Sequence, residues 1–207
     1  MNIDEAYSEW STTYDADHNL TRDLDQMVVR QEVAGRRYKS ILEIGCGTGK
    51  NTTLLADIGE RVLALDFSAG MIEKAKAKVA RANVTFRHAD ITQTWPCDDG
   101  MFDLISCNLV LEHIENLSFI FAEAARVLTD GGCFFVCELH PFRQYQGTQA
   151  RFQRAQDTTE IAAFVHHISD FVDAAAANGL SLNNLKEWWH ADDEGKPPRL
   201  ISFRFEK

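Results

Sequence analysis

The segment 40–51, with the sequence SILEIGCGTGKN, constrains this chain more than any other part of it. An apolar run that suits a buried strand is followed by three glycines at alternate positions and then by a helix-compatible segment. The glycines at 45, 47 and 49 allow positive φ angles and let a ligand approach backbone N–H groups without a Cβ in the way. Because a helix N-terminus also attracts anions, the segment predicts a strand, turn and helix that bind a nucleotide-like cofactor.

The composition is that of one ordinary globular domain covering residues 1–207, with 45% hydrophobic and 25% charged residues. The net charge of −10 argues against binding to nucleic acid or to anionic membranes, which requires concentrated positive charge. The five cysteines are odd in number and form no CxxC pair, which is typical of buried thiols in a reducing compartment. We therefore expect a cytoplasmic protein with neither a signal peptide nor a membrane span.

Strand and helix patterns alternate after the glycine turn. Helices are predicted after Ser68, which is a suitable N-cap, and from 117 to 128. Such alternation predicts an α/β fold with a parallel sheet covered on both faces. The two last strands read as an antiparallel hairpin, giving a seven-stranded, mostly parallel sheet. The strands are predicted within 40–45 and at 61–66, 83–88, 102–107, 133–139, 180–189 and 200–205.

Four parts are expected along the chain. The N-terminal arm (1–39) has helical periodicity at 20–29. Its aromatic residues Tyr7 and Tyr14 either pack or line a ligand cleft on the acceptor side. Residues 140–160 form a polar and aromatic insert that is too long for a plain connection between two elements. The parts are an N-terminal arm (1–39), a cofactor-binding core (40–139), an acceptor-side insert (140–160) and a C-terminal helix with a strand hairpin (161–207).

Three features narrow the cofactor. The turn has the form Glu43-x-Gly45-x-Gly47-x-Gly49, which differs from the GxGxxG of nicotinamide and flavin enzymes. Asp66 ends the next predicted strand, where a carboxylate can accept hydrogen bonds from both hydroxyls of a ribose. Asp90 follows the strand after that and is placed to accept a hydrogen bond from an exocyclic amine.

This arrangement resembles the class I S-adenosylmethionine-dependent methyltransferases, in particular the small-molecule branch that includes the ubiquinone and menaquinone enzymes. The resemblance covers roughly residues 40–139 and implies a Rossmann-like, doubly wound fold. It implies that Glu43 orients the methionine amino group and that the turn, including Gly45, Cys46, Gly47 and Gly49, passes beside the methionine. It further implies that Asp66 holds the ribose, that Phe67, Met71, Asp90 and Ile91 surround the adenine, and that Asn108 lies near the sulfonium.

Methyl transfer from a sulfonium is an in-line displacement, so a catalytic base is needed only if the acceptor arrives protonated. His140 directly follows a strand at the carboxyl edge of the sheet and is the preferred candidate for a base; anchoring of the loop is its alternative role. His113, in the sequence Glu-His-Ile, is the second candidate and otherwise fixes a helix start. Arg143 and Tyr145 are expected on the acceptor side, where they suit a carboxylate-bearing or phenolic substrate.

The sequence disfavours several related chemistries. The segment after Asn108 lacks the Asn/Asp-Pro-Pro-aromatic turn of methyltransferases that act on nucleic acids. No acidic cluster follows there, so we expect no magnesium, and Cys97 is interpreted as an ordinary loop thiol. A non-catalytic partner subunit that binds S-adenosylmethionine or S-adenosylhomocysteine remains an alternative, as does, less favoured, a nicotinamide oxidoreductase. A monomer and a homodimer are both compatible with the sequence.

Overall fold

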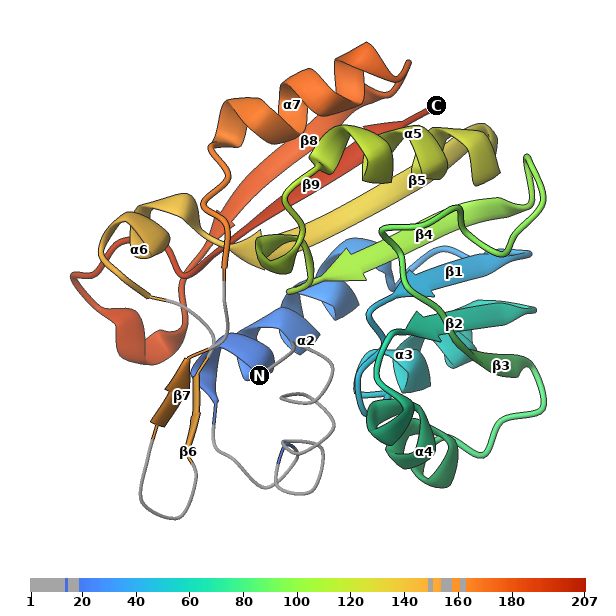
Figure 1. The fold of residues 1–207 in the computed structure, drawn as a ribbon, viewed down its shortest axis with the longest axis horizontal. Coiled ribbons are helices and arrows are strands. Elements are labelled where there is room, and N and C mark those ends of the chain that lie inside the picture. Colours follow the sequence, from blue (N-terminus) through green and yellow to red (C-terminus); the bar gives the residue numbers. More distant parts are fainter. Residues whose placement is uncertain (1–13, 15–18, 149–150, 154–157, 161–162) are drawn as a thin grey trace.

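The computed structural model describes residues 14, 19–148, 151–153, 158–160 and 163–207. Figure 1 shows the main sheet, whose strands are β1 (Ile41–Ile44), β2 (Val62–Asp66), β3 (Val84–His88), β4 (Phe102–Asn108), β5 (Leu128–Leu139), β8 (Ser181–Trp188) and β9 (Leu200–Glu206). The helices are α2 (Leu20–Val33), α3 (Thr52–Ile58), α4 (Ala69–Lys78), α5 (Leu117–Val127), α6 (Pro141–Tyr145) and α7 (Ile168–Ala177), with short 3-10 turns η1 (Leu111–His113) and η2 (Ala191–Asp193). A separate pair, β6 (Arg151–Gln153) and β7 (Thr158–Glu160), completes the described elements.

The strand order of the main sheet is β3-β2-β1-β4-β5-β9-β8. The strand β1 pairs in parallel with β2 on one side and with β4 on the other, so the connections run in opposite directions from this point. In such sheets the carboxyl ends of the two central strands diverge and leave a crevice for a ligand. The glycine turn follows β1 and therefore lies in this crevice.

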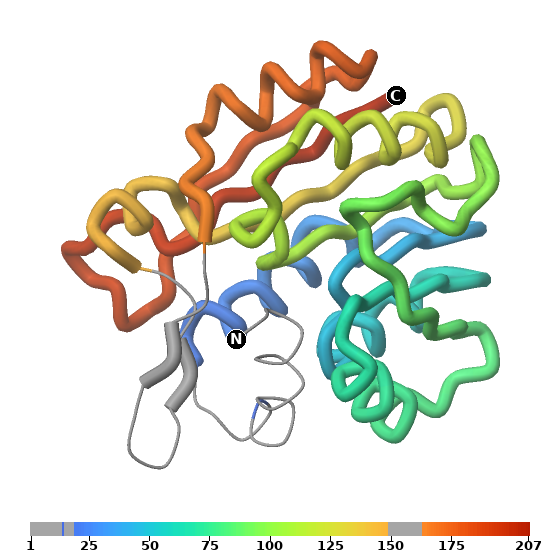
Figure 2. The backbone as a smooth tube through the Cα atoms, in the orientation of Figure 1, coloured from blue at the N-terminus to red at the C-terminus, as the bar shows by residue number. Residues whose placement is uncertain are grey.

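The predicted antiparallel ending of the sheet is confirmed. The strand β9 runs antiparallel to both β5 and β8, with Phe134 opposite Phe205 and Trp188 opposite Leu200. Figure 2 shows these late strands beside the much earlier β5, where the C-terminal segment returns to the sheet. The α/β, seven-stranded and mostly parallel fold expected from the sequence is thus the observed one.

Helices cover both faces of the sheet, and the alternation of side chains along β5 shows how. Phe134 and Val136 belong to the apolar cluster beneath α5 and α7, whereas Phe135 and Cys137 belong to the cluster that packs on α2. The helices α5 and α7 contact each other on the first face, as Figure 1 also shows. Phe121 of α5 is fully buried there and meets Phe134 and Phe205 edge-on, at 5.2 and 5.3 Å between ring centroids.

Side-chain caps start several helices where the sequence suggested. The Ser68 hydroxyl accepts a hydrogen bond from the backbone N–H of Met71 at 3.3 Å and begins α4. Asn19 and Asn116 cap α2 and α5 in the same manner. Within the described ranges, no helix is both long and apolar enough to cross a membrane.

Two predicted boundaries differ from the structure. The fifth strand begins at Leu128 and not at 133, because Leu128 already pairs with Phe102 of β4, and a register shift separates this pair from the rest of the ladder. Gly131, at φ 74°, supplies the irregular backbone that this shift requires. The helix expected at the start of 161–207 begins only at Ile168, so Phe164 lies before it, and the Phe164 backbone N–H donates to the carbonyl oxygen of Glu112 at 2.7 Å.

Candidate cofactor and acceptor site

The glycine turn after β1 has positive φ at Gly45, Gly47 and Gly49, at 69°, 53° and 82°. These glycines serve two purposes. A Cβ at Gly45 would collide with Val110, and one at Gly49 would lie 2.9 Å from Val79, so both positions are needed for close packing. A Cβ at Gly47 would meet no protein atom within 4 Å. The turn therefore presents bare backbone to open space at Gly47.

Asp66, at the end of β2, fixes the shape of this turn. One of its carboxylate oxygens accepts a hydrogen bond from the Gly47 backbone N–H at 2.8 Å, and the other accepts one from Ser68 at 2.9 Å. The residue is buried, with 5% of its surface exposed. Asp66 thus both holds the glycine turn and lines the cavity beside it.

A cavity of about 510 Å³ occupies the crevice at the carboxyl ends of β1 and β4. Nearly all the residues predicted to bind the cofactor line it: Glu43, Gly45, Cys46, Gly47, Asp66, Phe67, Met71, Asp90, Ile91 and Asn108. Gly49 is the exception, since it packs behind the turn against Val79 and Ala75 of the α4 region. Asp90 also forms a local turn, in which its Oδ1 accepts hydrogen bonds from the backbone and hydroxyl of Thr92 at 2.9 and 2.7 Å.

Glu43 contributes a buried acid to the floor of the cavity. Burial raises the pKa of its carboxyl group to about 8, and the nearby negative charges of Asp66 and Asp25 act in the same direction. The Thr52 hydroxyl, which donates to Glu43 Oε2 at 2.5 Å, opposes this shift without cancelling it. A cationic group bound next to Glu43 would therefore lower this pKa and favour the ionised carboxylate.

The structure adds residues from α2 that the sequence reasoning missed. Asp25 and Arg22 both line the cavity, and Asp25 accepts hydrogen bonds from Asn51 at 2.8 Å and from Asn108 at 2.9 Å. A signal for Asp25 exists in the sequence, because a helical spacing places this acid on the same face as the buried Val28 and Val29. A charged residue on an apolar helix face requires a polar partner elsewhere in the fold.

Of the two aromatic residues proposed for the acceptor side in the arm, Tyr7 lies outside the described residues. Tyr14 lines the cavity, and the Arg22 guanidinium stacks over its ring at 3.9 Å from the centroid. Burial raises the pKa of the Tyr14 hydroxyl, although the adjacent Arg22 opposes the shift. Tyr14 is therefore a neutral aromatic wall of the cavity.

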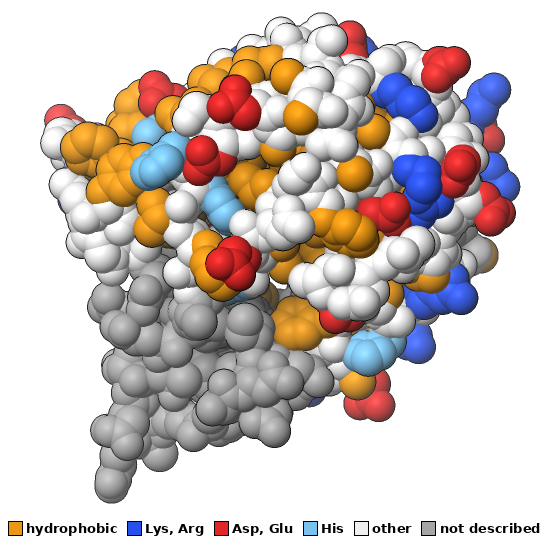
Figure 3. Space-filling view, turned by 45° about the horizontal axis from the view of Figure 1, so that its top comes forward, with side chains coloured by type: hydrophobic (Ala, Val, Ile, Leu, Met, Phe, Trp, Pro, Cys, Tyr) orange, Lys and Arg blue, Asp and Glu red, His pale blue; other side chains and the backbone are white. Residues whose placement is uncertain are grey.

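A second cavity of about 370 Å³ adjoins the first and shares Thr92, His113 and Ile114 with it. Its remaining lining comes from the start of α5 and from the segment before α7: Glu115, Asn116, Phe119, Ile120 and Phe164. His113 lies in η1 with 8% of its side chain exposed, and its Nε2 is 3.8 Å from Glu112 Oε1. Figure 3 shows histidine side chains next to hydrophobic ones on the face that it presents. His113 thus stands at the junction of the two cavities.

The other predicted histidine occupies a different position. His140 caps α6: its Nδ1 accepts from the Phe142 backbone N–H at 3.1 Å, and its Nε2 lies 2.9 Å from Glu187 Oε1. It does not line either cavity. The same holds for Tyr145, whose hydroxyl lies 2.6 Å from His167 Nδ1. These positions match the loop-anchoring alternative for His140.

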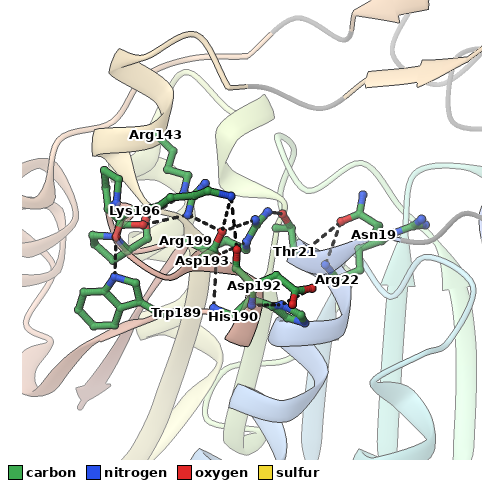
Figure 4. Close-up of polar contacts among 12 residues, drawn as sticks. Asn19, Thr21, Arg22, Arg143, Trp189, His190, Asp192, Asp193, Lys196 and Arg199 are labelled. Atoms are coloured by element: carbon green, nitrogen blue, oxygen red, sulfur yellow. Dashed lines mark hydrogen bonds and ion pairs between the residues drawn. The ribbon is translucent and has the colours of Figure 1, made fainter.

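Arg143 also points away from the two cavities. Figure 4 shows it next to Asp193 of η2, with Nη2 at 3.0 Å from Asp193 Oδ1, and the same guanidinium donates to the carbonyl oxygen of Pro197 at 2.9 Å. Arg199 binds both oxygens of Asp193, at 2.6 and 2.7 Å. Burial works against ionisation of Asp193, but the two arginines outweigh it and hold its pKa at about 2. Arg143 is therefore part of an ion-pair cluster.

In the described part of the chain, no group of three or more His, Cys, Asp or Glu side chains is arranged to hold a metal ion. The backbone is strained just after the end of β4. Leu109, which lines the main cavity, has φ 56° and is the only described non-glycine residue with a positive value. Such backbone strain is common at ligand sites.

The strand order, the glycine turn and the acid at the end of β2 define a class I methyltransferase fold, the class whose cofactor is S-adenosylmethionine. Residues 42–136 match the family model described as "Methyltransferase domain". The chain is 33% identical over 137 residues to a demethylmenaquinone methyltransferase of Clavibacter sepedonicus, a match that covers 64% of this chain and 56% of that protein. The cofactor class expected from the sequence is thereby confirmed.

Other relatives and solved structures agree on the class. A ubiquinone biosynthesis O-methyltransferase of Xanthomonas oryzae pv. oryzae is 28% identical over 159 residues, which are 73% of this chain and 63% of that protein. The chain thus spans little more than half of the length of these relatives. The N-methyltransferase NodS of Bradyrhizobium japonicum, solved with S-adenosyl-l-homocysteine, has the same fold at a TM-score of 0.76 and 18% identity, over 100% of this chain and 99% of that one. An S-adenosylmethionine-dependent methyltransferase of Mesorhizobium loti gives the same score and identity over 91% and 100%.

Proposed function

We propose that this protein transfers a methyl group from S-adenosylmethionine to a small organic acceptor. One observation supports this most directly. The cavity beside the glycine turn, which has a ring of buried acids, adjoins a second and more apolar cavity through His113 and Ile114. A cofactor in the first cavity and an acceptor in the second would meet at these two residues.

The residues around the first cavity fit this cofactor. Gly47 leaves the space that a close ligand needs, and the Asp66 carboxylate, a group that can accept hydrogen bonds from ribose hydroxyls, lines the same cavity. Glu43 faces the position proposed for the methionine amino group, whose positive charge would favour its ionised form. Phe67, Met71 and Ile91 supply the apolar contacts for the adenine ring, with Asp90 at its edge.

When bound, S-adenosylmethionine would supply an electrophilic methyl group, which an acceptor lone pair would take while sulfur kept the electron pair of the broken S–CH₃ bond. The protein binds both partners in line and excludes water. We propose that His113 orients the acceptor and takes the proton that a hydroxyl or amine acceptor loses. Its position at the junction of the cavities supports this role over a role for His140.

The second cavity favours an acceptor with an apolar body and no negative charge. Ile114, Phe119, Ile120 and Phe164 form its apolar walls, and the only charged side chain among the described lining is the acid Glu115. Arg143, the cation expected to attract a carboxylate, is bound to Asp193 instead. A carboxylate-bearing acceptor would therefore find no cation among these lining residues.

The proposal is tested in two steps. Calorimetry should detect binding of S-adenosylhomocysteine and none of NAD, after which phenols, amines and carboxylates are screened with radiolabelled S-adenosylmethionine. With an acceptor identified, His113→Gln should lower turnover by about tenfold to a hundredfold with cofactor affinity unchanged, because acid–base catalysis contributes on this scale. His140→Gln is the matched control and should retain turnover.

The outcomes separate the alternatives. Cofactor binding without methylation of any acceptor would favour the non-catalytic partner subunit. Binding of NAD alone would refute the proposed cofactor. Equal turnover of the wild type and His113→Gln would remove His113 from the chemistry. Loss of turnover in His140→Gln alone would instead support His140 as the base, as expected from its position after the fifth strand.

A further inference from the structure

The carboxylate of Asp25 joins the two walls of the cofactor cavity. It comes from α2, at the N-terminal side of the chain, and accepts one hydrogen bond from each wall. Asn51, next to the start of α3, donates to Oδ2 at 2.8 Å, and Asn108, at the end of β4, donates to Oδ1 at 2.9 Å. Asp25 itself lines the cavity and is only 4% exposed.

The hydrogen-bond partners of Asp25 indicate where its carboxylate would lie relative to a bound cofactor. Asn108 ends the strand whose carboxyl end faces the reacting centre, while Asp66 and Glu43 face the proposed ribose and methionine amino positions. Of these three buried acids, Asp25 is the one bonded to Asn108. The described lining of the cavity also contains two cations. Lys50 pairs with Asp23 at 2.7 Å, and the Arg22 guanidinium stacks over the Tyr14 ring at 3.9 Å from its centroid.

We infer that Asp25 is a specificity-determining residue that favours the cationic sulfonium of S-adenosylmethionine over the neutral thioether of S-adenosylhomocysteine. The inference rests on the proposed function and names a residue that its assignment did not include. A carboxylate held in a largely buried wall interacts strongly with a ligand charge and weakly with a neutral sulfur. Loss of the ligand charge during methyl transfer then removes this attraction and assists product release.

An unpartnered oxygen on Asn51 makes the substitution Asp25→Asn informative. Asn51 Oδ1 is buried and has no hydrogen-bond partner in the described structure. Because an amide can turn over, the side-chain NH₂ of an asparagine at position 25 can donate to Asn51 while its oxygen still accepts from Asn108. The variant therefore removes the charge and keeps both connections between the walls.

The experiment compares the affinities of wild type and Asp25→Asn for S-adenosylmethionine and S-adenosylhomocysteine by calorimetry. We expect the variant to bind S-adenosylmethionine about tenfold more weakly and S-adenosylhomocysteine about equally well, the scale for a unit charge several ångströms away in a partly buried site. Glu73→Gln, at an exposed position of α4 outside the cavity lining, is the control for loss of one charge and should leave the ratio unchanged. Asp25→Ser removes the same charge with a smaller side chain and should reproduce the shift if the asparagine variant fails to fold.

Equal weakening of both ligands, or an unchanged ratio, would overturn the inference and leave Asp25 as a purely structural link. If the wild type binds neither ligand, the proposed function itself fails, and this inference fails with it. A fall in the affinity ratio that is specific to position 25 supports the inference.

Discussion

Replacement of Glu43 by glutamine removes one ionisable group from the floor of the cofactor cavity and preserves its shape. The glutamine carbonyl oxygen can still accept the hydrogen bond from Thr52. The wild-type carboxyl group has a pKa raised from 4.5 to about 8 by burial, with Asp66 and Asp25 as further causes. The ligand-free protein therefore carries a strongly pH-dependent contribution to its stability at this position.

The sign and size follow from proton linkage. Between pH 4.5 and about 8 the folded state keeps the proton on Glu43 and the unfolded state releases it. The contribution to stability is thus fully present below 4.5 and is lost as the pH rises through about 8. Each pH unit in this window costs about 1.4 kcal/mol, so the whole shift amounts to about 5 kcal/mol as an order of magnitude. Glutamine does not titrate, so Glu43→Gln should become more stable relative to wild type as the pH rises.

Urea unfolding without ligand, followed by circular dichroism, measures this difference. Between about pH 6 and about pH 8, the free energy of unfolding of the variant minus that of the wild type should increase by about 3 kcal/mol. Glu73→Gln, at an exposed position on α4, controls for the loss of one surface carboxylate. A difference for Glu43→Gln that stays constant over this range would refute the assignment of a buried, neutral acid at this position.

Two further predictions concern the turn. Gly47→Ala should fold with about 1 to 2 kcal/mol of backbone strain and bind S-adenosylhomocysteine at least about tenfold more weakly by calorimetry, because its Cβ enters the open space. Gly45→Ala, whose Cβ also collides with Val110, should have a lower melting temperature than Gly47→Ala. A lower melting temperature for Gly47→Ala than for Gly45→Ala would contradict these separate roles. Asp66→Asn should weaken ligand binding and also lower the melting temperature, since one of the backbone donors Gly47 and Ser68 loses its acceptor; unchanged melting would show that the turn holds its shape without this carboxylate.

Much of the fold could be predicted because its signals are local. The run before Gly45, the alternate glycines and the following helix identify β1 and its turn within a dozen residues. Parallel strands also bring their carboxyl ends to one edge, so the positions of Asp66 and Asp90 in the chain were sufficient to place both beside the turn. The antiparallel ending was visible in the alternation along β9.

Side-chain positions could not be predicted where hydrogen-bond and ion-pair partners lie far apart in the chain. Arg143 binds Asp193, fifty residues later, and His140 meets Glu187, so neither side chain is available to the cavities in this structure. No periodicity within the insert indicates these pairs. The roles of Asp25 and Asn108 likewise depend on a contact between residues 83 positions apart. Side-chain function in such loops is decided by tertiary contacts and not by local pattern.

The Asp193 cluster connects the acceptor-side insert to the helix that carries Asp25. Arg199 binds Asp193 and also donates to Thr21 Oγ1 at 3.1 Å, in the first turn of α2, as Figure 4 shows. Arg143 joins the same carboxylate from α6. The helix α2 also places Asp25 between the cavity walls. Arg143 is thus linked to α2 through Asp193 and Arg199, a contact between segments far apart in the chain that its place in the sequence does not indicate.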